Sequence, residues 1–287
     1  MFYPLQIEFA ASSLFLIIVS FSLAIIDIRK DALLTTKNTN KSFIHLHLHS
    51  EYSLLDGGNK IDALLRRVKE FGMDSVAVTD HGNLHGAFEF YTKAKAAKIK
   101  PILGIEAYVA VGDRKERKPT GICDGGFHLV LLAENNIGWK NLVKLSSDSF
   151  ANGFYYKPRM DHETLDQYSD GIIAINGHLG SSIAYHLCNF VDSGNEDDWN
   201  LALEEAKWHA KTFLPNEQGE PRFYIELQRH DVQDQIAINP FLIKLARELG
   251  LPLVCDNDAH FLGKEDWDAH DTLCCISMQK QKSDSER

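Results

Sequence analysis

Three histidines at alternate positions constrain the fold of this sequence more than any other feature. In the run 43–58, His45, His47 and His49 alternate with aliphatic residues. Residues two apart on an extended strand project to the same face, so the three imidazoles are expected to share one face. A strand buried in a dry core on both faces would be apolar throughout. The pattern therefore predicts one wall of a metal site. The alternative is an exposed strand with three solvated histidines.

Composition narrows the class of protein. The 287 residues are 44% hydrophobic and 24% charged, which is ordinary for one large α/β domain or two small ones. Forty acidic side chains against thirty basic ones give a net charge of −10, which argues against nucleic-acid binding through overall charge. Five cysteines without a Cys-x-x-Cys pair indicate reduced thiols in the cytoplasm. Any phosphate contact must therefore be local, through a basic patch or metal ions.

Residues 1–41 are an apolar leader followed by a polar linker. The run 9–26 has no charged residue, and at about 1.5 Å per residue a helix of this length comes just short of a bilayer core. Glu8 precedes the run without any Lys or Arg, which argues against a signal peptide. Three interpretations stay open: membrane contact through 9–26, a buried helix, or an extension outside the working protein. The abrupt start of patterned sequence at Phe43 favours the extension.

From residue 43 onward, short apolar runs alternate with helical periodicity. This alternation is typical of βα units around a parallel sheet, so an α/β fold is expected. Strands are predicted at 75–79, 101–110, 127–133, 171–176, 223–228 and 253–255. Helices are predicted at 61–71, 84–97, 137–150, 199–213 and 233–250.

Polar side chains follow several of the predicted strands directly. His81, His178 and the pair Asp258 and His260 each come at or just beyond the end of a strand. Active sites of parallel α/β folds assemble at this end, so these groups are expected to converge. Nitrogen and oxygen donors without thiolate suit zinc, manganese or iron, and several adjacent ions suggest hydrolysis of phosphate esters.

These residues carry a resemblance to a known family. Three stretches resemble the successive motifs of the polymerase and histidinol phosphatase (PHP) superfamily: His47-Leu48-His49-Ser50, Thr79-Asp80-His81-Gly82 and Asn257-Asp258-Ala259-His260. Four others are similar to the N-terminal PHP domain of bacterial DNA polymerase III alpha subunits: Ser53-Leu54-Leu55-Asp56-Gly57, 101–108, 125–128 and Tyr156-Lys157-Pro158-Arg159. The resemblance runs from about residue 43 to the C-terminus.

The resemblance implies a distorted (βα)7 barrel with a metal site at the C-terminal ends of its strands. The PHP domain would cover 42–270, and 271–287 would begin a truncated following region. The polymerase domains of the family would lie beyond the end of this chain.

The resemblance also implies three divalent metal ions, zinc or manganese. It assigns nine residues as ligands: His47, His49, Glu106 and Asp258 to the first ion, Glu106 as a bridge with His128 and His178 to the second, and Asp56, His81 and His260 to the third. The chemistry would depend on five of these nine, namely His47, His49, Glu106, Asp258 and His260.

The implied function is a metal-dependent phosphodiesterase of the 3′–5′ exonuclease type, for proofreading in DNA replication. A non-catalytic module that contacts a separate proofreading partner is one alternative, although a relic would tolerate apolar replacements of its costly buried charges. A free-standing phosphatase like histidinol phosphatase is another, and the polymerase-type stretches argue against it.

Basic and aromatic residues are candidates for holding a DNA 3′ end. Lys157 and Arg159 lie beside three aromatic residues, Arg114 begins a basic loop, and His230 follows a predicted strand. Aromatic rings next to cations stack bases and hold phosphates. Subunits of the replicative polymerase are the expected protein partners.

Overall fold

The structure is a computed structural model that describes residues 43–284. The predicted leader and linker at 1–41, including the apolar run 9–26, lie outside the described residues. Within 43–284, none of the helices combines the length and apolarity needed to span a membrane.

Helices and strands alternate along most of the described chain. The helices are α2 (Ile61–Glu70), α3 (Ala87–Ala96), η1 (Cys123–Gly125), α4 (Asn136–Ala151), α5 (His162–Gln167), α6 (Ser182–Ser193), α7 (Glu196–Thr212), α8 (Gln233–Leu249), η2 (Lys264–Asp266) and α9 (Trp267–Met278). The strands are β1 (Ser75–Val78), β2 (Lys100–Val109), β3 (Phe127–Ala133), β4 (Phe154–Tyr155), β5 (Lys157–Met160), β6 (Ile172–Asn176), β7 (Phe223–Gln228) and β8 (Leu253–Asp256). The domain boundary predicted at residue 270 falls inside α9.

The sheet closes on itself through the histidine-rich segment 44–50. The strand order is β4-β5-β2-β3-β6-β7-β8, and β1 pairs with β2. On one side of the segment, the Thr79 N–H donates to Leu48 O at 2.9 Å; on the other, the His49 N–H donates to Ala259 O at 3.0 Å. The ring therefore consists of this segment with β1, β2, β3, β6, β7 and β8. This arrangement confirms the predicted distorted seven-stranded barrel.

The sheet is mixed, whereas the sequence pattern predicted a parallel one. β3 runs antiparallel to β2 and to β6, and the pairs β1–β2, β6–β7 and β7–β8 are parallel. The connection from β2 to β3 contains only the short helix η1, so no long crossover helix returns the chain for a parallel pairing. As a result, the first residues of β3 meet the last residues of β2, which brings His128 to the rim.

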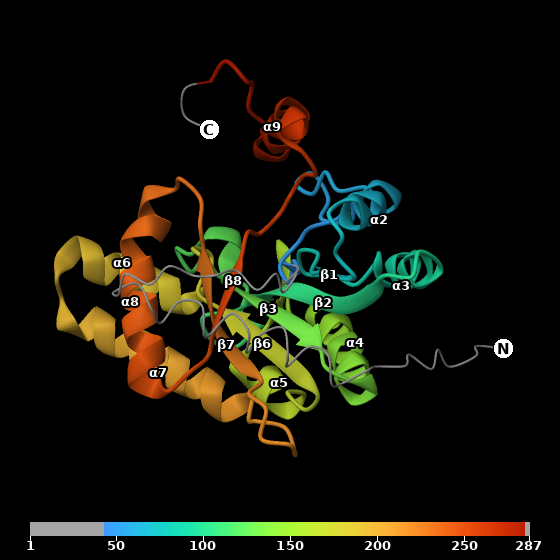
Figure 1. The fold of residues 1–287 in the computed structure, drawn as a ribbon. Helices are drawn as coiled ribbons and strands as arrows, with labels where there is room; N and C mark the ends of the chain where they lie inside the picture. Colours follow the sequence, from blue (N-terminus) through green and yellow to red (C-terminus); the bar gives the residue numbers. More distant parts are fainter. Residues whose placement is uncertain (1–42, 285–287) are drawn as a thin grey trace, which may run out of the picture.

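Alternate residues of the strands fill two separate cores. Ile102, Val130 and Ile175 belong to an inner core inside the barrel. Ile105 and Leu131 belong to the outer core, which packs against α4 and α6–α8. Figure 1 shows α6, α7 and α8 stacked together, with α2 and α3 on the opposite side of the molecule. The inner core forms an apolar floor beneath the polar end of the barrel.

The segment 44–50 bends, and the bend changes which residues face inward. Ile44 and Leu46 pack in the inner core, but Leu48 packs outside it with residues of α2 and α3. The N–H groups of Leu46 and His47 both donate to Asp256 Oδ2, at 2.6 and 3.1 Å. The prediction that all three histidines share one face is therefore wrong, because strict alternation stops at this bend.

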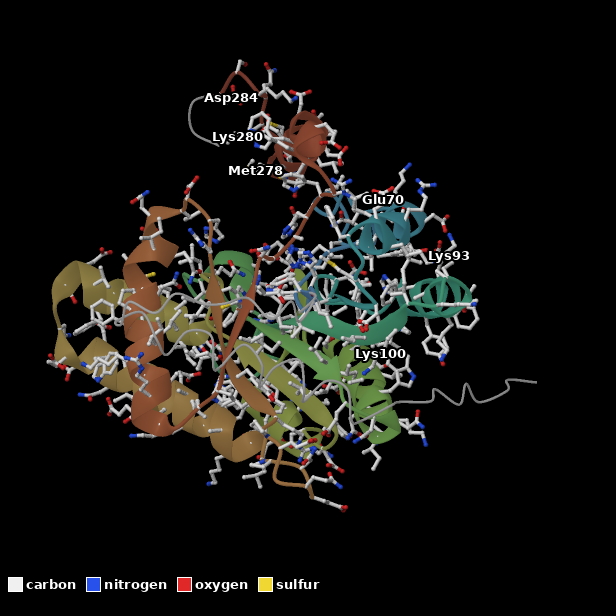
Figure 2. The ribbon with its side chains drawn as sticks, in the orientation of Figure 1. Glu70, Lys93, Lys100, Met278, Lys280 and Asp284 are labelled. Carbon is white, nitrogen blue, oxygen red and sulfur yellow. The ribbon has the colours of Figure 1, made fainter. Side chains whose placement is uncertain are left out.

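Basic side chains of α3 lie on the outer surface. Lys93 pairs with Asp62 and with Glu89, at 2.7 Å in each case. Figure 2 shows Lys93 and Glu70 on the outer side of the helices, away from the sheet. Lys93 is consequently not directed at the polar end of the barrel.

Candidate metal centre

Two histidines of the segment 44–50 reach the polar end of the barrel. His47 and His49 are fully buried, and their Nε2 atoms lie 3.2 and 3.1 Å from Asp258 Oδ1. His45 is placed differently, because its Nδ1 lies 3.8 Å from Asp256 Oδ1. Because of the bend, His47 and His49 point into the site, whereas His45 lies beside it.

Glu106 stands at the centre of the site. It occupies an inward-facing position of β2, is 1% exposed and lies in an otherwise apolar run. Five imidazoles surround its carboxylate: His47 Nε2 and His49 Nε2 at 3.4 Å, His81 Nδ1 at 2.6 Å, His128 Nδ1 at 3.1 Å and His178 Nε2 at 3.0 Å. A solvated strand residue would have no such surroundings, so Glu106 belongs to the polar site.

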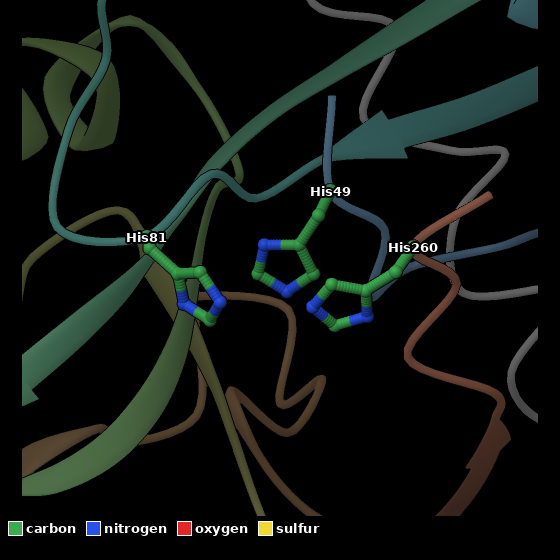
Figure 3. A group of neighbouring side chains, drawn as sticks. All are labelled: His49, His81 and His260. Carbon is green, nitrogen blue, oxygen red and sulfur yellow. The ribbon is translucent and has the colours of Figure 1, made fainter. Parts of the chain in front are cut away.

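A second carboxylate, that of Asp56, contacts His81 from its other ring nitrogen and also contacts His260. Asp56 Oδ2 lies 2.8 Å from His81 Nε2 and 3.4 Å from His260 Nε2. The ring of His49 stacks on that of His260, with centroids 4.2 Å apart, and lies 4.1 Å from that of His81. Figure 3 shows these three rings gathered around one space. The structure thus brings together all nine residues that the sequence predicted as ligands.

Several buried donor atoms at this centre form no hydrogen bond within residues 43–284. They include His47 Nε2, His49 Nε2, His81 Nδ1, Glu106 Oε2, His178 Nε2 and Asp258 Oδ1. Leaving a buried polar atom unpaired costs about 1–3 kcal/mol, more if it is charged. These atoms face one another, and three-residue sets such as His47, His49 and Glu106 place their donors within 4.8 Å. Imidazole and carboxylate donors at this spacing fit divalent metal ions.

At or next to three of the nine residues, the backbone makes a close approach or has a positive φ angle. A Cβ on Gly57, directly after Asp56, would overlap Ser50 O. Gly82, directly after His81, has φ +63°, and a Cβ there would lie 2.8 Å from a Tyr108 ring carbon. Asp258 itself has φ 51°, a conformation that Asp tolerates better than most side chains. Tight turns therefore set the positions of Asp56, His81 and Asp258.

Glu226, which the sequence motifs did not single out, orients two of the imidazoles. This fully buried β7 residue places Oε1 3.1 Å from His47 Nδ1 and Oε2 3.3 Å from His178 Nδ1. Carboxylates in this position fix the ring orientation of metal-binding histidines. The available signal was a carboxylate in the middle of the apolar run Phe223–Gln228.

His49 is oriented through a hydroxyl group. Its Nδ1 lies 2.9 Å from Ser53 Oγ, which donates to Asp80 Oδ1 at 2.9 Å. Asp80 also accepts from the Ser50 N–H at 2.7 Å. The imidazole is therefore held by a hydrogen-bonded chain that begins at a buried carboxylate.

The carboxylates favour positive charge at this centre. Burial lowers the pKa of His81, but Glu106 and Asp56 outweigh burial and raise it to about 10. Burial likewise lowers the pKa of His178, and Glu106 and Glu226 raise it to about 9. For His49, burial and the nearby His81 lower the pKa to about 3. Burial raises the pKa of Glu106, yet the surrounding imidazoles hold it well below its usual value.

The donors open onto a cleft of about 630 Å³, which Lys157 and His230 also line. Lys157 Nζ lies 3.3 Å from Tyr108 OH and 3.3 Å from Asp124 Oδ1, and its side chain is 39% exposed. His230 Nε2 lies 3.0 Å from Gln228 Oε1. The structure brings these two predicted substrate residues to the cleft, and their binding of substrate stays a prediction.

The other two predicted substrate residues, Arg114 and Arg159, are buried structural side chains. Arg114 Nε donates to Asp148 at 2.6 Å, and its Nη1 donates to Asp161 at 2.9 Å. Arg159 is 1% exposed; its Nη2 donates to the carbonyls of Arg114 and Glu116, and its Nε donates to that of Gly153. Their guanidinium groups hold the loop after β2 in place, so the predicted contact with DNA is wrong for these two residues.

Comparison with protein families gives a match over most of the chain. Residues 45–230 match the family described as "PHP domain". The chain is 44% identical over 247 residues to the DNA polymerase III subunit alpha of Borreliella burgdorferi, covering 85% of this chain and 20% of that protein. It is 43% identical over 248 residues to the same subunit of Thermus aquaticus, covering 85% and 19%. The chain thus spans about a fifth of the length of these relatives.

Solved structures with a similar arrangement are distant in sequence. A putative metal-dependent phosphoesterase from Bifidobacterium adolescentis aligns over 77% of this chain and 88% of its own, with 15% identity and a TM-score of 0.43. An amidohydrolase from Chromobacterium violaceum aligns over 80% and 96%, with 14% identity and a TM-score of 0.43. Both TM-scores are too low for a functional conclusion.

Glu226→Gln is expected to weaken metal binding about 10- to 100-fold, as loss of an orienting partner does at metal sites. The substitution keeps the shape of the side chain but removes the charge that holds His47 and His178. Competition with a chelator measures the affinity. Glu205→Gln is the matched control, because Glu205 also contacts two histidines, His162 and His209, but outside this centre. Equal affinities of both variants would contradict the orienting role.

Arg159→Lys is expected to lower the free energy of unfolding by about 2–4 kcal/mol, because lysine leaves buried carbonyls without donors. Urea unfolding measures this loss. Lys157→Gln, at the neighbouring exposed cation, should change stability by less than about 0.5 kcal/mol. If the Arg159→Lys protein were as stable as the wild type but bound DNA poorly, Arg159 would bind substrate after all, and its structural role would be contradicted.

Proposed function

Because the chain belongs to the PHP domain family, we propose that it hydrolyses phosphodiester bonds with divalent metal ions held around Glu106. The observation that carries this proposal is the set of buried imidazole and carboxylate atoms that face one another at the cleft without forming hydrogen bonds within residues 43–284. Three ions, zinc or manganese, would be held by nine residues: His47, His49, Asp56, His81, Glu106, His128, His178, Asp258 and His260.

Contacts within the chain fix the positions and orientations of the ligand side chains before any substrate binds. Glu106 touches imidazoles from five separate positions, so its two oxygens set the spacing between neighbouring sites. Glu226 and Ser53 contact the Nδ1 atoms of His47 and His49, on the side of each ring away from the other ligands. Bound divalent cations would supply the positive charge that activates water and neutralises phosphate oxygens. The donors need little rearrangement to receive them, because their orientations are already fixed.

We propose the 3′ end of a DNA strand as the substrate. Lys157 lies at the rim of the cleft with its Nζ 5.1 Å from the centre of the Tyr108 ring, and the neighbouring Tyr156 is 82% exposed. The Tyr108 ring is buried, so the exposed ring is that of Tyr156, which adjoins Lys157 in the chain; a cation next to an exposed aromatic residue suits the phosphate and base of a single strand. With a net charge of −10, attraction to DNA must come from such local groups, and it should weaken steeply with salt.

The names of the relatives support a role in DNA replication, since they are DNA polymerase III alpha subunits. We propose that the chain works in the cytoplasm beside subunits of a replicative polymerase. Its part would be removal of nucleotides from the 3′ end, as in proofreading. Nucleotide addition is not proposed for it, because the chain spans only about a fifth of these relatives.

Asp258→Asn and His260→Ala should each lower the shortening of a 3′-labelled DNA strand by at least about 100-fold, because even orienting partners at metal centres contribute 10–100-fold. Asn is chosen because it tolerates the positive φ of residue 258. Gel analysis of the labelled strand, with the 287-residue chain and added Mn²⁺ or Zn²⁺, measures the rate.

Asp170→Ala is the control, because this exposed carboxylate lies two residues before β6, outside the centre. It should leave the rate unchanged. Metal bound by the wild-type chain without any shortening of DNA would instead support the non-catalytic module. Full activity of Asp258→Asn and His260→Ala would contradict the proposed centre.

A further inference from the structure

Asp56 faces two different groups of donors with its two oxygens. Oδ2 lies beside His81 and His260, as described above. Oδ1 lies 3.6 Å from His270 Nε2 and 4.0 Å from Cys274 Sγ. A carboxylate placed in this way can bind one metal ion through each of its two oxygens. The second side has no part in the nine-residue centre.

The second group of donors comes from helix α9. His270 and Cys274 are four residues apart, which places both on one face of the helix. Figure 1 shows α9 beyond the end of the barrel, and Ser277 of this helix lines the same cleft as the metal centre. The ring of His270 lies 5.8 Å from that of His260. The helix therefore borders the centre at the Asp56 side.

The three side chains have the spacing of ligands to one ion. Cys274 Sγ lies 3.8 Å from His270 Nε2, and all three donors fall within 4.8 Å of one another. Tetrahedral zinc with bond lengths of about 2.0–2.3 Å separates its donors by about 3.3–3.6 Å. The observed separations exceed these by a few tenths of an ångström, which small side-chain rotations can close. The same separations also allow weak hydrogen bonds to sulfur and an ion pair between Asp56 and His270.

We propose that Asp56, His270 and Cys274 form an additional metal site, through which α9 is fastened over the cleft. This inference rests on the proposed metal centre, because Asp56 would be shared between the two. A thiolate selects soft or borderline ions, so zinc or cobalt(II) would bind here and manganese would not. The other donors of the centre are nitrogen and oxygen, which gives the α9 site a distinct spectroscopic signature.

Cobalt(II) tests the proposal directly. The metal-free 287-residue chain, with reduced thiols under argon, is titrated with Co²⁺ while its absorption spectrum and metal content are measured. A thiolate ligand to cobalt gives a charge-transfer band in the near ultraviolet, which nitrogen and oxygen ligands do not give. The wild-type chain should show this band, and Cys274→Ser should abolish it.

His270→Gln should weaken uptake of the cobalt ion that gives the band by at least about tenfold, because loss of a ligand should cost no less than loss of an orienting partner. Cys188→Ser is the matched control, since this half-buried cysteine lies on α6 and should leave the band unchanged. Circular dichroism melting of the metal-free variants checks that each remains folded.

The outcomes separate this inference from the proposed function. Cobalt uptake with visible absorption but without the thiolate band overturns the α9 site and leaves the centre around Glu106 standing. A band that persists in Cys274→Ser also overturns the α9 site. Failure of the wild-type chain to bind cobalt overturns both proposals.

Discussion

A carboxylate buried inside the barrel is the constraint on which the rest of the site depends. An isolated ionised carboxylate in a dry interior is far too costly to persist, and removing one partner from a buried pair costs about 3–5 kcal/mol. Glu106 is stable there because five imidazoles surround it, and they come from four separate parts of the chain. The imidazoles are in turn held from behind by Glu226 and by Ser53. The centre is therefore a set of opposite charges that stay together only if the barrel is closed.

Closure of the barrel depends on both apolar and polar contacts. The inner core forms the floor, because the inward-facing residues earlier in each parallel strand are aliphatic or aromatic. Above this floor, Asp256 holds the bend that turns His47 and His49 inward. The antiparallel direction of β3 adds His128 from the start of a strand. The same closure leaves a cleft over the charged centre, and this cleft is where a phosphodiester would meet the donors.

Much of the fold could be predicted because its strands are apolar and its helices are periodic. The predicted strands at 127–133 and 223–228 coincide with β3 and β7, and the predicted helix at 233–250 ends one residue beyond α8. The direction of β3 was missed because periodicity carries no information on pairing. The bend at Leu46 was missed because it depends on Asp256, which is 210 residues away. Of the site, the nine predicted ligands come together, but Glu226 was overlooked because its partners are distant in sequence. Arg114, in a basic loop, and Arg159, beside aromatic residues, were misassigned because these sequence patterns are the same whether an arginine binds DNA or buried carboxylates and carbonyls.

Anomalous X-ray diffraction from crystals of the chain grown with Zn²⁺ or Mn²⁺ tests the metal centre most directly. If metal ions bind around Glu106, anomalous peaks should lie at coordination distance, about 2.0–2.3 Å, from its carboxylate and from the imidazoles around it. A centre without anomalous signal, in crystals shown to contain the metal elsewhere, would contradict the proposed metal centre. The five histidines around Glu106 would then serve only to neutralise a buried charge.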